Sequence, residues 1–531
     1  MKPANDTRAE WWLAACITAA IAVLHFYFWR HAGALWRDEV NTVTLAQSPS
    51  WSLLTHDTFP ILLPLLVKFW SLVAHSDEWL RLLGALLGLG IIAGFWGVAL
   101  ATRRPPLFSL VLFGLNLLLF YCGDSLRAYG LGSALIVLAM ASLWFYLRQS
   151  SWPRAALFAL AATLSVQTLF QNSVLVFALC LAAFAVCSRR KAWAAAVKVL
   201  CAGAAAALSL LPYWPRLAGL PQAAVELRVG FSFPLTQLNF EKATGFPFAG
   251  ATAIWEALAL LTVAFALLSL RSKPNNEANV DPDLPLFAGV ALTASVGLYF
   301  VFLWLAAVGA KPWYFMPPLA IAAACFDSGI VLPALPRLVR VAVFAAVSGL
   351  ALSAAWLITP ELGRQLTNAD RIADRLAATA APQDFVIVTP WYYGMPFNRY
   401  FHGAAQWDTL PPLADHTLHR YDLVLDGMKD TNSLAPVLQK ISTTLRAGHR
   451  VWIVGLLEWP PDLSETPPVL PPPPLPRYGW SDLPYMGSWA WRTSFYLAKH
   501  SEHFVPVPEA NTGTRGLQEQ LYLFSADGWR D

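Results

Sequence analysis

The 531-residue chain is 56% hydrophobic and only 13% charged, and its formal net charge at pH 7 is +4. Soluble proteins carry roughly 25% charged residues, so the composition excludes an ordinary soluble protein and predicts one that lies in a membrane. So small a net charge gives no support for nucleic-acid binding.

Stretches of about 20 apolar residues are long enough to cross a bilayer. The first such stretch lacks the cleavage site of a removable signal peptide, so we expect it to remain as an anchor. Residues 59–74 are apolar but short, and they predict a helix that lies in the membrane interface or re-enters it and does not span the membrane. The sequence predicts about eleven transmembrane helices, near 11–29, 80–100, 107–121, 130–147, 155–170, 173–187, 193–211, 252–270, 286–307, 313–331 and 339–358.

Basic residues predict the orientation of these helices, because Lys and Arg accumulate in cytoplasmic loops. With the N-terminus inside, every cytoplasmic loop carries at least two basic residues, in the segments 103–104, 148–154, 189–191, 271–273 and 337–340. The C-terminus is then outside. We expect a multi-pass protein of a bacterial inner (cytoplasmic) membrane whose C-terminal domain lies in the periplasm.

The chain is predicted to divide into a membrane domain at 1–359 and an extracytoplasmic domain at 360–531. In the second domain, helical patterns cover 362–378 and 433–446, and strand-like runs occur at 384–390, 421–427, 450–456 and 521–525. This alternation indicates a small α/β sheet. The predicted fold class is therefore a polytopic α-helical membrane protein with a soluble C-terminal α/β domain.

An adjacent pair of carboxylates, Asp38 and Glu39, follows the first apolar stretch within WRDEVNTVTLA. Acidic residues at a helix start can cap free amides and interact with the helix dipole. Alternatively, a carboxylate here can act as a general base, because a sugar or serine hydroxyl is a poor nucleophile until its proton is removed.

Cations and tyrosines recur on the predicted outer loops. Arg127 and Tyr129 lie in GDSLRAYGLG, and Lys311 and Tyr314 lie in VGAKPWYFMPP. One reading is interfacial anchoring by long basic and aromatic side chains. The other is phosphate binding, for which a guanidinium on the outer side is well suited.

A third outer stretch, HDTFPILLPLLVKFW, contains His56, Asp57 and Lys68 around the predicted interfacial helix. A lone histidine at an interface is more often structural than catalytic. The paired histidines His416/His419 and His500/His503 lack the further ligands that a zinc site requires, so we predict no metal site.

Taken together, these motifs resemble the GT-C glycosyltransferases, in the clan of the protein O-mannosyltransferases and the lipid A aminoarabinose transferase (glycosyltransferase family 39-like). WRDEV matches the clan's acidic first-loop motif, and Arg127-Ala128-Tyr129 matches its Arg-x-Tyr motif. The interfacial stretch is a degenerate match, with Phe59-Pro60 where His/Pro-Pro is usual. Near the last spans Lys311 stands in for a missing arginine, and Gln171-Asn172 replaces a His/Tyr pair.

The resemblance, which covers about residues 1–358, implies a sugar donor linked to polyprenyl phosphate. It implies a hexosyl- or pentosyltransferase acting at the outer face on a lipid, protein or glycan acceptor. Asp38 is the expected general base of an inverting displacement, and Glu39 supports it by orienting it or by binding a sugar hydroxyl or a divalent ion. No cofactor is certain, and a requirement for a divalent cation stays open.

The same resemblance assigns donor phosphate and lipid binding to Arg127, Tyr129, Lys311 and Tyr314, and a substrate cavity to His56, Asp57 and Lys68. Two other function classes remain open. One is a transporter or flippase of lipid-linked sugars, although the sequence has no inverted repeat and no charge deep in a predicted span. The other is a non-catalytic scaffold of the cell envelope.

Overall fold

The computed structural model describes residues 5–51, 59–215, 231–246, 248, 250–271, 281–306, 309–332, 335–457, 470, 472, 481–507 and 519–531. They form two compact units. The first contains the described residues of Met1–Arg30, Pro49–Pro215 and Gly230–Gly363, and the second those of His31–Ser48 and Arg364–Asp531. A short segment that directly follows the first apolar helix therefore folds with the C-terminal residues.

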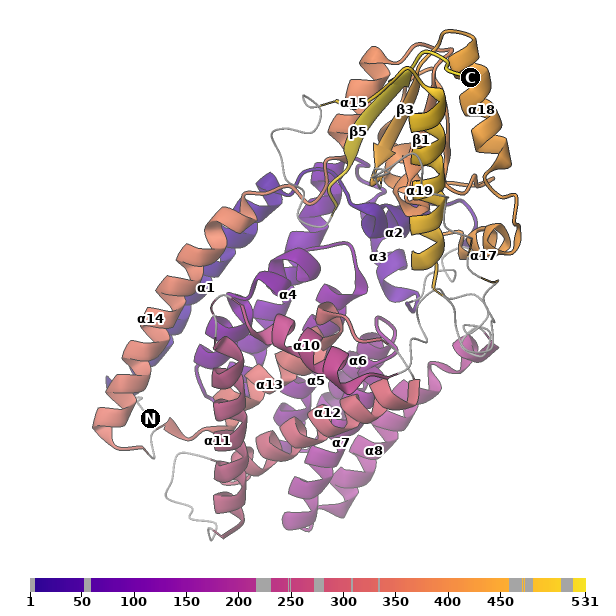
Figure 1. Ribbon diagram of the computed structural model, residues 1–531. Coiled ribbons are helices and arrows are strands. Elements are labelled where there is room, and N and C mark those ends of the chain that lie inside the picture. The colour runs from indigo at the N-terminus through magenta and orange to yellow at the C-terminus, as the bar shows by residue number, and fades with distance from the viewer. Residues whose placement is uncertain are drawn as a thin grey trace. The chain divides into compact units, whose positions relative to one another are not determined.

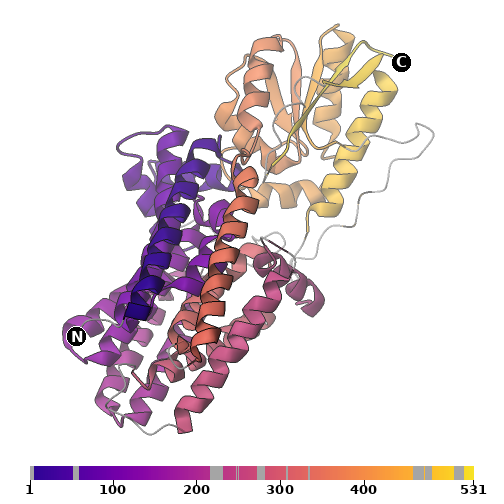
Figure 2. The same cartoon turned by 90° about the vertical axis from the view of Figure 1, so that its left-hand side faces the viewer.

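The described residues of the first unit form helices joined by turns and loops, without a strand among them (Figure 1). Two π-helical segments, Ser109–Gly114 and Leu119–Gly123, interrupt the chain between α4 and α5. In both views α1 and α14 run alongside each other (Figures 1 and 2). The α-helices are α1 (Asn5–His31), α3 (Leu62–Trp70), α4 (Asp77–Thr102), α5 (Ala128–Arg148), α6 (Trp152–Val166), α7 (Asn172–Arg189), α8 (Trp193–Leu208), α10 (Phe233–Thr244), α11 (Ala251–Arg271), α12 (Leu284–Ala306), α13 (Met316–Gly329) and α14 (Arg337–Leu362).

Eight helices of the described chain are long and apolar enough to cross a membrane: α1, α4, α5, α7, α8 with its extension to Tyr213, α11, α12 and α14. These match eight of the predicted spans. The other three predicted spans fall on shorter elements, namely the two π-helical segments, the 15-residue α6 and the 14-residue α13. Within the stretch predicted to form an interfacial or re-entrant helix, residues Leu62–Trp70 form α3.

Helix α13 is enclosed by protein, since every residue from Met316 to Gly329 is buried. A helix that is apolar on all sides is either enclosed by protein or faces lipid, and the burial of every residue of α13 shows the first arrangement. Near its end, Asp327 accepts hydrogen bonds from the backbone amides of Phe108 (2.7 Å) and Ser109 (3.0 Å). These amides begin a helical segment and have no partner within it, so the carboxylate satisfies them.

The second unit is built on a five-stranded sheet in the order β2-β1-β3-β5-β4. The first three strands of this order are parallel, and β5 pairs antiparallel with both β3 and β4. The strands are β1 (Phe385–Thr389), β2 (Gln406–Thr409), β3 (Val451–Gly455), β4 (His503–Pro506) and β5 (Tyr522–Asp527). The helices are α2 (Arg37–Gln47), α15 (Ala369–Thr379), α16 (Gly394–Tyr400), α17 (Tyr421–Lys429), α18 (Ala435–Arg446) and α19 (Leu483–His500).

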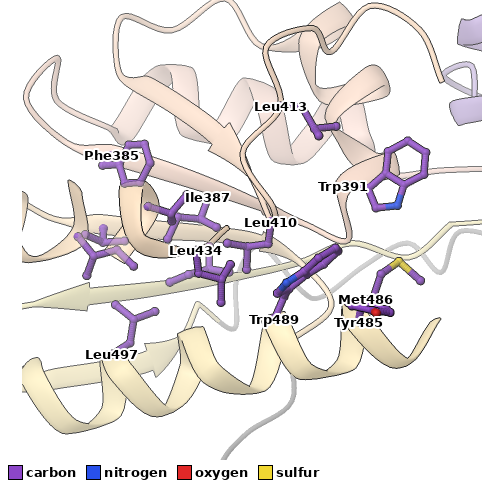
Figure 3. Close-up of a cluster of buried hydrophobic side chains, with 14 of the residues drawn as sticks. Phe385, Ile387, Trp391, Leu410, Leu413, Leu434, Tyr485, Met486, Trp489 and Leu497 are labelled. Atoms are coloured by element: carbon purple, nitrogen blue, oxygen red, sulfur yellow. The ribbon is translucent and has the colours of Figure 1, made fainter. Parts of the chain in front are cut away.

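Apolar side chains are buried on both faces of this sheet. Phe385 and Ile387 of β1 contribute to one core, whereas Val386 and Val388 contribute to the other. Alternate residues of a strand point to opposite faces, so a strand buried on both sides reads as a continuous apolar run. Figure 3 shows the first core, in which Trp489 of α19 lies beneath the strands.

The prediction of a sheet-containing tail is confirmed, with strands at 385–389, 451–455 and 522–527 where strands were expected. The predicted strand at 421–427 is wrong, because these residues form α17. The buried side chains Val424, Leu425 and Met428 have helical spacing, and a short apolar run does not by itself distinguish a strand from a helix.

Candidate active site

The predicted carboxylate pair lies in the first turn of α2, within the second unit. Glu39 is fully buried, and its Oε2 accepts a hydrogen bond from the backbone amide of Trp36 (3.3 Å), the residue before the helix. An acidic side chain at the third helical position satisfies a free amide in this way. Glu39 therefore stabilises the start of the helix that carries Asp38.

Asp38 is held between two nitrogen-bearing side chains. Its Oδ1 lies 3.3 Å from Nε2 of His419 and 3.5 Å from Nε of Arg37. The side chain of Asp38 is 17% exposed, so a reactant can reach a carboxylate that is otherwise enclosed. Such a carboxylate is oriented by its neighbours and accessible, as a general base must be.

Arg37 links Asp38 to a second carboxylate, Glu519. The Arg37 backbone amide donates to Oε1 and Oε2 of Glu519 (3.2 and 3.3 Å), and the guanidinium lies 4.0 Å from the centre of the Tyr392 ring. Burial opposes the charge of Arg37, but Asp38 and Glu519 outweigh it and raise the pKa of the guanidinium. Burial raises the pKa of Glu519 to about 8, against the lowering effect of Arg37.

His419 is fixed by aromatic contacts. Its ring stacks on Tyr421 (centroids 5.3 Å apart, planes 4° apart) and meets Trp391 edge-on at 6.0 Å. Its backbone amide also donates to Oδ1 of Asn41 (3.1 Å), one turn along α2 from Asp38. Residues three apart on a helix share a face, so Asp38 and Asn41, one turn apart on the same face of α2, both contact His419.

The sequence alone did not reveal the residues around Asp38 and Arg37. Arg37 directly precedes Asp38 in the WRDEV motif, so its proximity could have been predicted from the sequence. Tyr392, His419 and Glu519 lie more than 350 residues away, and only His419 had been considered, as a zinc ligand. Within the residues that the structure describes, no group of three or more His, Cys, Asp or Glu side chains is arranged to hold a metal.

A second cluster, in the first unit, brings together three of the predicted donor-binding residues. Arg127 is the residue before α5, and its guanidinium lies 5.0 Å from the centre of the Phe59 ring. Tyr129 is buried, meets Phe59 edge-on at 5.5 Å and stacks on Tyr314 at 6.0 Å. The cluster therefore places the Arg127 guanidinium beside the contacting aromatic rings of Phe59, Tyr129 and Tyr314.

The two stretches that depart from the clan pattern contact each other in this cluster. The backbone carbonyl of Tyr314 accepts hydrogen bonds from the Tyr299 hydroxyl (2.6 Å) and from Nε2 of Gln171 (3.4 Å). Lys311 is exposed at the start of the short 3₁₀ helix Pro312–Phe315. Gln171 thus contacts Tyr314, the residue that stacks on Tyr129 of the Arg-x-Tyr motif.

The residues predicted to line a substrate cavity are placed only in part. Lys68 lies in the last turn of α3, with its Nζ 5.1 Å from the centre of the Trp51 ring. His56 and Asp57 lie outside the described residues.

No protein-family model matches the sequence, and no curated protein matches it. Among solved structures, apo ArnT from Cupriavidus metallidurans is similar at a TM-score of 0.51 and 14% identity, over 83% of this chain and 92% of that chain. ArnT bound to undecaprenyl phosphate gives a TM-score of 0.49 with the same identity and coverage. The Archaeoglobus fulgidus oligosaccharyltransferase gives 0.44 at 12% identity, over 82% and 67% of the two chains. At these identities the likeness concerns the fold, and this chain has a GT-C-like fold with a C-terminal sheet-containing domain.

Proposed function

We propose that this protein is a membrane glycosyltransferase that moves a sugar from a polyprenyl-phosphate donor to a hydroxyl of a lipid, protein or glycan acceptor. The reaction takes place at the outer face of a bacterial inner membrane, with the C-terminal unit in the periplasm. The GT-C-like fold supports this class, and ArnT, which shares the fold, has been crystallised with undecaprenyl phosphate. The observation that carries the proposal is the accessible Asp38 carboxylate held between His419 and Arg37.

In the proposed reaction Asp38 accepts the proton of the acceptor hydroxyl as its oxygen attacks the anomeric carbon. The bond from that carbon to the phosphate oxygen breaks, and polyprenyl phosphate leaves with the electron pair. Attack from the face opposite the leaving group inverts the configuration. Because the phosphate is a stable anion, no general acid is needed, and cations can stabilise the charge that develops on it. We assign this role to Arg127 and Lys311, with Tyr129 and Tyr314 beside the donor.

The neighbours of Asp38 prepare it for this step. His419 and Arg37 hold one of its oxygens, and Glu39 stabilises the turn of helix from which it projects. A base that is already oriented avoids reorganisation during the reaction. The C-terminal unit, which supplies His419 and Glu519, is therefore part of the proposed catalytic machinery.

The test uses the purified full-length protein in detergent with a panel of polyprenyl-phosphate sugars, and mass spectrometry follows release of polyprenyl phosphate. We expect Asp38→Asn to lower turnover by roughly 10²- to 10⁴-fold while donor binding is kept. The matched control is Asp370→Asn, which changes another first-turn aspartate of the second unit and should leave turnover unchanged.

Equal turnover by Asp38→Asn would remove Asp38 from the reaction. If the protein is a flippase, both the wild type and Asp38→Asn, reconstituted in vesicles, should move lipid-linked sugar across the vesicle membrane without releasing polyprenyl phosphate. If the wild type neither turns over nor binds any donor in the panel, the scaffold alternative is favoured.

A further inference from the structure

A buried histidine–aspartate pair lies in the first unit, apart from the residues assigned above. Nδ1 of His25, on α1, is 2.7 Å from Oδ2 of Asp124, in the segment between the second π-helical turn and α5. The side chains are 0% and 2% exposed, and the His25 ring also packs against Phe120 at 4.6 Å. Burying ionisable groups is costly, so a pair that is kept fully buried calls for a functional explanation.

Two glycines of α4 make room for Asp124. A Cβ atom on Gly84 would lie 1.8 Å from the backbone carbonyl oxygen of Asp124, and one on Gly88 would lie 1.8 Å from its Oδ1. Arg81 is buried and interacts electrostatically with Asp124. These three α4 residues follow helical spacing, so one face of α4 receives both the backbone and the side chain of Asp124.

The fixed aspartate is only three residues from Arg127. Between them, Ser125 Oγ donates to the carbonyl of Cys122 (2.9 Å). The first turn of α5 also lies against this segment, because a Cβ on Gly130 would be 2.1 Å from the carbonyl oxygen of Gly123. The segment has little freedom to shift, and the position of the Arg127 backbone follows from that of Asp124.

We propose that the His25–Asp124 pair, seated on Gly84 and Gly88, is a positioning device that fixes Arg127 and Tyr129 for the donor phosphate. The inference rests on the proposed function, because it concerns the same phosphate site. A guanidinium contributes most when it is held in place before the ligand arrives. In this proposal the pair holds the Arg127 backbone in place through its contacts with α4, and it does not itself contact the donor.

The experiment measures binding of undecaprenyl phosphate, without a sugar, to the full-length protein in detergent. We expect Asp124→Asn and Arg127→Gln each to raise the Kd roughly tenfold or more. The double variant should be no weaker than Arg127→Gln alone, since the pair acts through Arg127. His25→Asn should bind nearly as the wild type does, because its amide nitrogen can take the place of Nδ1, whereas His25→Leu should resemble Asp124→Asn.

A glycine pair on α4 gives a test that leaves every charge in place. Gly88→Ala should displace Asp124 and weaken binding, whereas Gly90→Ala should not, because a Cβ at Gly90 meets only the Cβ of Ala134 at an ordinary 3.6 Å. If Gly88→Ala does not fold, the affinity of Asp124→Asn for undecaprenyl phosphate alone tests the positioning role.

Wild-type affinity in folded Asp124→Asn, or losses that multiply in the double variant, would overturn the positioning role while leaving the proposed function intact. A wild type that binds no undecaprenyl phosphate would instead refute the donor assignment, and the positioning role with it. The two failures are therefore distinguishable in a single titration series.

Discussion

Replacing Glu519 with glutamine should flatten the pH dependence of this protein's stability. Glu519 is 3% exposed, and burial raises the pKa of its carboxyl from the ordinary 4.5 to about 8, although Arg37 acts in the opposite direction. Between these values the folded protein holds a proton that the unfolded chain has released. The stabilisation is therefore fully present below pH 4.5 and is lost as the pH rises toward 8.

The magnitude follows from the difference of one bound proton, which corresponds to ~1.4 kcal/mol per pH unit within the window. Glutamine has nearly the shape of the protonated acid and does not titrate. Relative to Glu519→Gln, the wild type should therefore lose roughly 5 kcal/mol of unfolding free energy across the window of about 3.5 pH units between 4.5 and about 8. Apparent Tm values from intrinsic tryptophan fluorescence, measured between about pH 5 and about pH 8, should diverge accordingly.

Glu502→Gln is the matched control, because Glu502 is an exposed glutamate of the same unit and its replacement should leave the pH profile unchanged. Parallel Tm curves for the wild type and Glu519→Gln would refute the reasoning, since they would mean that Glu519 binds no extra proton on folding. A wild type that gains stability relative to the variant as the pH rises would reverse the sign and show that the Arg37 charge outweighs burial.

Two further predictions concern single buried contacts. Asn368 both donates to and accepts from the backbone of Leu521 (2.8 Å each), so Asn368→Ala should cost about 2 kcal/mol or more and lower the apparent Tm. Asp283 pairs with Arg190 (2.6 Å) and Arg189 (3.3 Å), so Asp283→Asn should cost about 1–3 kcal/mol. Asp281→Asn, at a more exposed partner of Arg190, should cost less, and equal Tm losses for the two would contradict this account.

Composition and apolar run length were sufficient to predict the membrane class, and eight expected spans are long apolar helices in the structure. The spans expected at 107–121 and 313–331 show the limit of run length. There the chain forms π-helical turns and the enclosed helix α13, because contacts with neighbouring helices decide how an apolar run folds.

In the C-terminal unit, alternation and apolar runs located β1, β3 and β5, whereas α17 was mistaken for a strand. The strands that were missed, β2 and β4, are four residues long and mostly not buried. They are defined by hydrogen bonds to partner strands far along the chain, and a local pattern carries little of that information.

The sequence by itself determined that a carboxylate pair follows the first long apolar stretch, and it marked Arg127, Tyr129 and Tyr314 as candidate binding residues elsewhere in the chain. Only the tertiary structure decided that α2 folds with the C-terminal residues, and that His419 and Glu519 surround Asp38 and Arg37. A local sequence pattern indicates only which residues lie close together within one or two helical turns. The environment of a charge depends instead on which distant groups the folded chain brings within a few ångströms.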